Sequence, residues 1–133
     1  MDSLPTTSLI ARTLALLVLS LCAFPTAHGV LHITEFMADN GGSRLDSDGD
    51  ASDWIEIFNP KQEPVDLDGW FLSDDPNELQ KWAFPKVILK PAQFLVVFAS
   101  GRDLAERGQE LHTNFKLSRR GEYLSLAQPN LSI

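Results

Sequence analysis

The sequence predicts an all-β domain built as a sandwich of two antiparallel sheets. Short runs of β-branched and aromatic residues alternate with turn signals from residue 30 to the end of the chain. Segment 54–59 places Ile55 and Ile57 on one face and other side chains on the opposite face, as a half-buried strand does. Segment 94–100 is apolar on both faces, which suits a central strand covered by packed sheets.

The first 29 residues differ from the rest and predict a secretory signal peptide. A single Arg12 precedes an apolar run over residues 13–24, and Pro25 opens a stretch of mostly small residues before Val30. The run is shorter than the roughly 20 residues that span a bilayer, so a retained membrane anchor is the less favoured alternative. We expect residues 1–29 to be removed, leaving one domain without cysteine, because the one cysteine of the chain lies in the removed segment.

The expected strands follow one another at short spacing. They cover residues 31–37, 54–59, 65–67, 70–73, 81–84, 94–100, 113–117 and 122–127. Dipeptides such as Asp68-Gly69 and Lys90-Pro91 separate them, because their backbone preferences favour turning. The chain stops soon after the last strand without a closing turn. We therefore expect residues 30–133 to be a C-terminally truncated domain that lacks one or two final strands.

Charge is distributed unevenly along the chain, which has a net charge of −7. The stretch from Asp39 to Glu78 has twelve acidic and two basic residues, whereas the stretch from Leu79 onward has eight basic and four acidic ones. The acidic part repels phosphate and anionic lipid, so nucleic acid and membrane surfaces are not expected as partners. The basic residues stand singly apart from one pair, which predicts solvated edges and turns.

Six ordered segments resemble one known family. They are residues 33–40 (ITEFMADN), 53–60 (DWIEIFNP), 66–75 (DLDGWFLSDD), 81–85 (KWAFP), 94–101 (FLVVFASG) and 111–118 (LHTNFKLS). Together they make the chain similar to the bacterial branch of the lamin tail domain family, over about residues 31–128. The resemblance implies an immunoglobulin-like β-sandwich. It also implies an accessory module of a large exported protein, of the kind found beside spore-coat-kinase-like domains, fibronectin-like repeats or hydrolases.

The acidic stretch before segment 54–59 is the best candidate for a ligand site. Asp46, Asp48 and Asp50 alternate as oxygen ligands do in calcium loops, and Asp53 adds a fourth carboxylate. Calcium, a hard cation that takes about 6 to 8 oxygen ligands, is the metal that suits this set. The EF-hand pattern is not matched, because its glycine and its final glutamate are absent. The alternative is an exposed turn whose side chains cap their own backbone.

No motif in the mature chain predicts catalysis, so a non-enzyme is expected. His32 and His112 flank strand segments without a nearby nucleophile motif, and so few nitrogen ligands argue against zinc. We expect His32 on the solvent side of a strand and His112 in a loop with local hydrogen bonds. Glu35 shares the strand face of Ile33 in strict alternation, and we expect it to be buried and to bond N–H groups of a turn.

These observations predict a non-catalytic interaction or structural module of a secreted or cell-surface protein, whose partner is a protein or a cell-surface polymer. One alternative is an accessory domain of an exported enzyme, spore-coat-kinase-like or a hydrolase, with its catalytic part beyond residue 133. Another is a carbohydrate-binding module that uses exposed tryptophans. Against the latter, we expect Trp54, Trp70 and Trp82 to be packed inside, because a sandwich without disulfides needs their large buried area.

Overall fold

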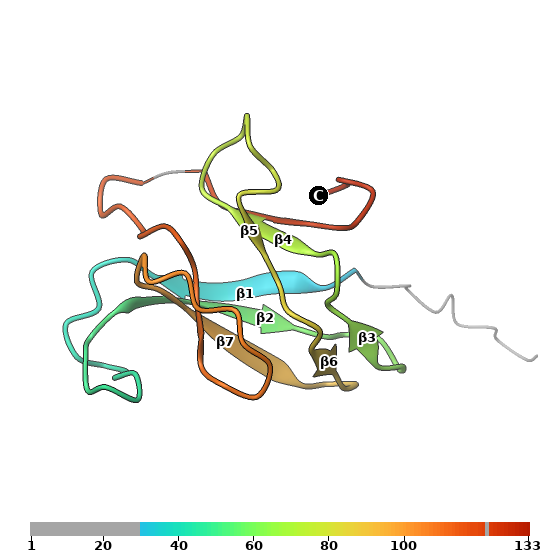
Figure 1. Ribbon diagram of the computed structural model, residues 1–133, viewed down its shortest axis with the longest axis horizontal. Helices are drawn as coiled ribbons and strands as arrows, with labels where there is room; N and C mark the ends of the chain where they lie inside the picture. Colours follow the sequence, from blue (N-terminus) through green and yellow to red (C-terminus); the bar gives the residue numbers. More distant parts are fainter. Residues whose placement is uncertain (1–29, 122) are drawn as a thin grey trace, which may run out of the picture.

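The computed structural model describes residues 30–121 and 123–133, and this part of the chain consists of strands and turns (Figure 1). The predicted signal peptide lies outside the described residues, as does Glu122 at the start of the last expected strand. Within the described ranges, no helix is long and apolar enough to cross a membrane. The strands are β1 (His32–Met37), β2 (Asp53–Phe58), β3 (Val65–Asp66), β4 (Phe71–Ser73), β5 (Trp82–Ala83), β6 (Ile88–Leu89), β7 (Phe94–Ala99), β8 (Leu111–His112) and β9 (Ser125–Ala127).

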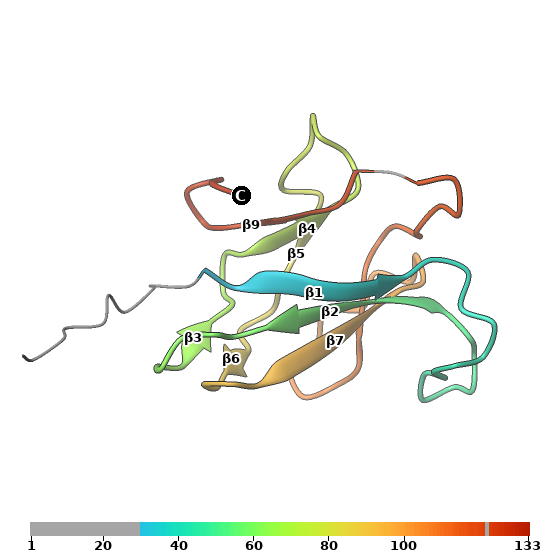
Figure 2. The same cartoon turned by 180° about the vertical axis from the view of Figure 1, so that it is seen from behind.

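Two sheets form a sandwich, which confirms the predicted immunoglobulin-like fold. One sheet has the strand order β1-β2-β7-β8, the other has the order β5-β4-β9, and β3 pairs with β6 in a two-stranded ribbon. Every pair is antiparallel except β7 with β8. Both views place the β3–β6 ribbon at one end of the molecule and the long connection between β1 and β2 at the other (Figures 1 and 2).

The hydrophobic core lies between the two sheets. Ile55, Ile57 and Val97 enter it from one sheet, Leu72 enters from the other, and none of the four has measurable exposure. Burying a side chain of this size stabilises the fold by about 1.5 to 3 kcal/mol. All three tryptophans are buried as expected; Trp70 and Trp82 belong to this core, and Trp54 is covered on the opposite face of its sheet.

A β-bulge in β1 overturns the expectation for Glu35. Ile33 pairs with Ile57, but the register then shifts, so that Glu35 pairs with Glu56 and Phe36 pairs with Ile55. Ile33 and Phe36 therefore share the core-facing side, although strict alternation would separate them. Glu35 is turned outward and is exposed, and its carboxylate makes no hydrogen bond or ion pair within the described residues. The predicted role of its carboxylate in bonding a turn is wrong.

Two other strand predictions differ from the structure. Strand β6 was not expected, since two residues between prolines are too short to show a pattern. The segment 113–117 was expected as a strand, but Thr113 turns the chain by donating from its hydroxyl to the carbonyl of Phe115 (2.7 Å). Its alternation reflects burial of Phe115 and Leu117 against the core, and its one pairing is an isolated antiparallel bridge between Lys116 and Ser100. The strand at this place is the shorter β8, just before it.

Candidate functional site

Residues 40–52, within the connection between β1 and β2, form the acidic loop, and side chains close its base. Oδ1 of Asp53 accepts hydrogen bonds from the backbone N–H groups of Asp39 (2.7 Å) and Asn40 (3.0 Å). The buried amide of Asn40 donates to the carbonyl of Ser52 (2.9 Å), and its Oδ1 accepts N–H groups of the following turn. The two ends of the loop are thus joined before β2 begins.

Asp46 organises the middle of the acidic loop from a position where its side chain is fully shielded from solvent. Oδ1 of Asp46 accepts the N–H groups of Asp48 (3.1 Å) and Asp50 (2.9 Å), and Oδ2 lies 3.3 Å from the hydroxyl of Ser52. Burial alone would raise the pKa of Asp46. That pKa is nevertheless held below its usual value by the backbone N–H of Asp50, the charge of Arg102, the N–H of Asp48 and the hydroxyl of Ser52. The carboxylate is therefore charged and capped.

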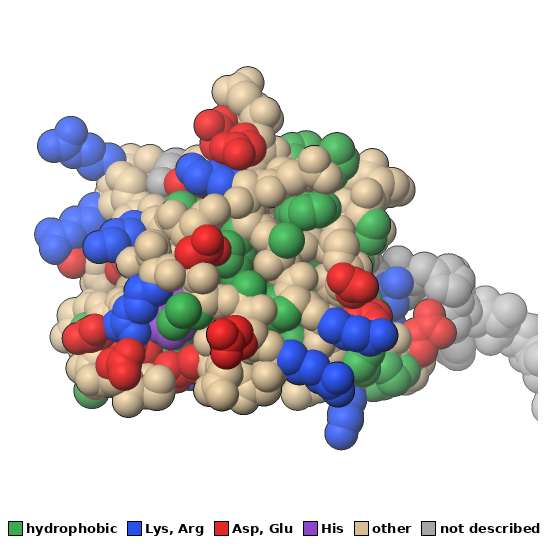
Figure 3. Space-filling view, in the orientation of Figure 1, with side chains coloured by type: hydrophobic (Ala, Val, Ile, Leu, Met, Phe, Trp, Pro, Cys, Tyr) green, Lys and Arg blue, Asp and Glu red, His purple; other side chains and the backbone are tan. Residues whose placement is uncertain are grey.

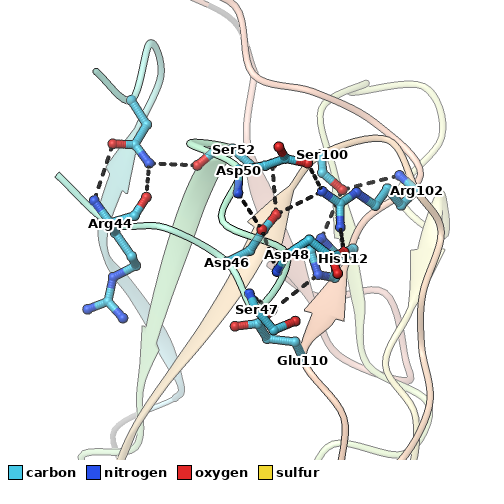
Figure 4. A network of polar contacts seen from close by, with 11 residues as sticks. Arg44, Asp46, Ser47, Asp48, Asp50, Ser52, Ser100, Arg102, Glu110 and His112 are labelled. Atoms are coloured by element: carbon cyan, nitrogen blue, oxygen red, sulfur yellow. Dashed lines mark hydrogen bonds and ion pairs between the residues drawn. The ribbon is translucent and has the colours of Figure 1, made fainter. Parts of the chain in front are cut away.

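Arg102, just beyond the end of β7, clamps the loop to the sheet (Figure 4). Its Nη2 lies 3.0 Å from Oδ2 of Asp46 and 2.5 Å from Oδ2 of Asp50, and its Nη1 lies 2.6 Å from Oδ2 of Asp48. Asp48 and Asp50 keep 70% and 68% of their side-chain surface exposed, so water screens these two arms. The arm to Asp46 is the shielded one, and we expect it to contribute most.

Glu110 is a second attachment point for the loop. Its Oε2 accepts the backbone N–H of Ser47 (2.7 Å). The N–H of Ser47 lowers the pKa of Glu110; burial opposes this, while the hydroxyl of Ser47 and nearby His112 add to the lowering. Figure 4 shows the two attachments together: Arg102 reaches the loop from the end of β7, and Glu110 reaches it from the residue before β8.

His112 is buried in β8 rather than placed in a loop, so that part of its prediction is wrong. Nδ1 of His112 lies 2.9 Å from the hydroxyl of Ser100, and the ring stacks on Phe98 at 5.3 Å between centroids. Nε2 lies 3.7 Å from Oε2 of Glu110, which is too long for a hydrogen bond. The serine, histidine and glutamate therefore pack together without the aligned bonds of a catalytic triad. His32 is exposed in β1, as predicted.

The acidic loop covers one half of the outer face of the four-stranded sheet, the face opposite the core. The covered half consists of Trp54, Phe98 and His112, which are all buried. The guanidinium of Arg44, from the loop, lies over the Trp54 ring at 5.4 Å from its centroid. The acidic loop therefore works as a lid of fixed position over aromatic residues that would otherwise face water.

The open half of the same outer face begins where the loop ends. Phe58 and Phe94 lie opposite each other on β2 and β7, with ring centroids 4.5 Å apart, and Phe94 is 52% exposed. Figure 3 shows surface hydrophobic side chains among Lys and Arg side chains over the end of the molecule where β3, β6 and the start of β7 lie. The turns beside the phenylalanine pair carry Lys61 and Lys90.

The four residues predicted to bind calcium are divided by the structure. Asp46, Asp48 and Asp50 do lie together, but around the guanidinium of Arg102, whereas Asp53 lies at the base of the loop and bonds backbone N–H groups. In residues 30–121 and 123–133, no three His, Cys, Asp or Glu side chains are grouped as a metal site requires. The carboxylates of Asp46 and Asp53 cap backbone N–H groups, as the alternative interpretation expects, whereas those of Asp48 and Asp50 pair with Arg102. Calcium binding stays a prediction.

Arg102 and Glu110 are the residues of this site that sequence reasoning missed. The basic residues were expected to be solvated, but Arg102 pairs with three aspartates more than 50 residues away in the chain. Lys81 also departs from that expectation, with its Nζ 2.7 Å from Oδ1 of Asp74. The one signal was compositional: an isolated arginine after a strand in a domain whose acids are concentrated elsewhere.

The structure is an immunoglobulin-like β-sandwich in which polar and charged side chains hold the acidic loop in place. The family model described as Lamin Tail Domain matches residues 25–131. The chain belongs to the lamin tail domain family, a family of non-catalytic immunoglobulin-like domains, and the resemblance is confirmed at that level. No curated protein and no solved structure matches the chain.

Proposed function

We propose that this lamin tail domain is a non-catalytic interaction module of a secreted or cell-surface protein. The observation that carries the proposal is the open half of the outer face, where Phe58 and Phe94 stay in contact with water although equivalent aromatic residues under the acidic loop are buried. Aromatic residues are enriched in the centre of protein interfaces. Export is supported by the signal-like sequence of residues 1–29.

The chemistry of the open half favours a protein or an anionic surface polymer as partner. An apolar centre formed by the phenylalanine pair is flanked by Lys61 and Lys90, so an acidic partner gains charge complementarity at the rim. The acidic loop lies at the opposite end of the molecule and would repel the same partner. Contact is therefore expected at the β3–β6 end.

Two measurements test this function. N-terminal sequencing of the protein recovered from outside its own cells should begin at Val30; an intact Met1 terminus in the cytoplasm contradicts export. Binding of the purified protein to the surface fraction of those cells should be lost in the double variant Phe58→Ser, Phe94→Ser. The matched control is Leu45→Ser, an exposed leucine of the acidic loop that lies away from the Phe58–Phe94 pair. Equal binding by all three proteins would place the interface elsewhere.

Calcium binding by the acidic loop is a separate proposal, supported by the clustering of Asp46, Asp48 and Asp50 around one cationic group. A bound calcium ion would have to compete with Arg102 for these oxygens, because both take the same carboxylates. Calcium would then stiffen the lid of the covered half rather than create a new catalytic or binding centre.

A further inference from the structure

The free edge of β1 borders an open groove that the proposed interface does not use. The groove has a volume of about 480 Å³ and is lined by Ile33, Thr34, Glu35, Phe36 and Leu124. Strand β1 is the edge of its sheet and β9, just after Leu124, is the edge of the other sheet. Figure 2 shows these two edges on the same side of the sandwich. The groove is therefore a place where the sandwich is not closed.

The β-bulge gives this groove an apolar wall. Because the bulge inserts one residue, Ile33 and Phe36 both face the core side, opposite Ile57 and Ile55. Phe36 is nevertheless 57% exposed, since nothing in the described part of the chain covers it on the edge side. A core-facing phenylalanine with more than half of its surface in water marks an unfilled position in the packing.

The backbone along this edge also lacks partners. Within the residues that the structure describes, β1 pairs on one side only, with β2. The outward N–H and C=O groups of such an edge strand are a template for one more strand. An extended chain is the ligand that can bond this backbone and cover Ile33, Phe36 and Leu124 at the same time.

Charge narrows the kind of chain that fits. Glu35 is the one charged residue among those that line the groove, and its carboxylate has no partner within the described residues. An added strand that is acidic here is repelled, whereas a lysine or arginine opposite Glu35 is attracted. The β1 bulge and the charge of Glu35 also hinder non-specific pairing at this edge, so they restrict which extended segments can bind.

We propose that the edge of β1 is a strand-acceptor site. It takes an extended segment of a partner protein, with apolar side chains against Ile33 and Phe36 and a basic side chain against Glu35. Affinity comes from main-chain hydrogen bonds and specificity from the alternating side chains. This inference goes beyond the proposed function, because it concerns a different surface and does not depend on the Phe58–Phe94 pair.

The test uses the full chain, labelled with ¹⁵N, and two synthetic probes. One is a blocked peptide in which valine and threonine alternate around a central lysine, and the other has a central glutamate. We expect the lysine peptide to shift amide signals of residues 33–36 and Leu124 and to bind about tenfold more tightly than the glutamate peptide. Glu35→Lys should reverse that preference, and Phe36→Ser should weaken both peptides. Leu45→Ser, at an exposed leucine of the acidic loop, is the matched control and should change neither affinity.

Three results would overturn the proposal. The first is an absence of shifts in β1 at millimolar peptide. The second is equal affinity for the two peptides in the parent protein and in the Glu35→Lys variant. The third is a dimer in sedimentation experiments that dissociates on Phe36→Ser, because a second copy of this chain would then occupy the groove. The side chains of Glu35 and Phe36 are exposed, so the variants at these two positions are expected to fold.

Discussion

The covered and the open halves of the outer face are built from the same two strands and similar side chains, yet they behave differently. Trp54 and Phe98 are 6% and 3% exposed under the acidic loop, whereas Phe94, on the same strand and the same face as Phe98, is 52% exposed. The difference does not come from the strands. It comes from a loop of polar residues that hydrogen bonds and ion pairs hold in one place.

This comparison shows how a polar loop can protect an apolar surface. Leu45, the one large apolar residue of the loop, is 55% exposed, so the position of the loop depends on its polar anchors: Asp46, Arg102, Glu110 and Asp53. Where such anchors are missing, at the open half, the aromatic residues remain available to a partner. The same sheet therefore carries a covered, stabilising half and an open half, which we propose binds a partner.

The largest expected effect is a difference in stability between matching substitutions in the covered and the open half. Phe98→Ala should lower the free energy of unfolding by about 3 to 5 kcal/mol, because it leaves a cavity beneath the loop. Phe94→Ala should cost about 1 kcal/mol, because half of that side chain is already in water. Urea unfolding of both variants measures the difference. Similar losses would mean that the loop does not shield its half.

The next effect concerns the anchor of the loop. Asp46→Ala should destabilise the protein by about 2 to 4 kcal/mol, because it orphans two backbone N–H groups and removes the shielded partner of Arg102. Asp48→Ala is the control and should cost at most about 1 kcal/mol, since Asp48 is exposed. Denaturant unfolding measures the free energy of unfolding of both variants. A larger loss of stability in Asp48→Ala than in Asp46→Ala would contradict the assignment of Asp46 as the anchor.

A smaller effect is expected from acid. The pKa values of Asp46 and Glu110 are lowered in the folded state, so the stability they contribute is present above their unfolded values, about 4, and is lost as pH falls through the folded values. Stability measured from pH 7 downward should fall below about pH 4, and Glu110→Gln should flatten that fall. Asp68→Asn, at an exposed turn, is the control. An unchanged pH profile in Glu110→Gln would contradict the linkage.

The smallest effect is that of calcium on the lid. If calcium and Arg102 compete for the same carboxylates, millimolar calcium should raise the melting temperature of Arg102→Gln by several degrees and that of the parent protein by less. The control is Arg102→Gln combined with Asp48→Asn and Asp50→Asn, which should not respond. No calcium response in Arg102→Gln would remove the metal proposal and leave the acids as backbone caps.

Much of the fold could be predicted because burial leaves a periodic pattern along the longer strands. Strands β2 and β7 are six residues each, and their alternation shows which side chains face the core. Strand β6 has two residues and leaves no such pattern. The bulge in β1 defeated the prediction for Glu35 because one inserted residue reverses the face of every residue after it.

The candidate site was predicted only in part, for a related reason. The loop was found because its acids are close together in the sequence, and the capping alternative describes the carboxylates of Asp46 and Asp53. Their cationic partner could not be found, because Arg102 approaches Asp48 across 54 residues of chain and no local pattern encodes that contact. Short-range reasoning therefore found the charges but not what neutralises them.

The Arg102 clamp has a consequence for how this end of the molecule responds to its surroundings. It joins distant parts of the chain as a disulfide would, in a described region that contains no cysteine. Reductants therefore have no disulfide to break there. Dissolved salt, by contrast, acts on the clamp. At physiological ionic strength, where the Debye length is about 8 Å, salt weakens the exposed ion pairs of Arg102 with Asp48 and Asp50, while the shielded pair with Asp46 persists. The tightness of the lid therefore follows the ionic strength outside the protein and does not depend on a disulfide.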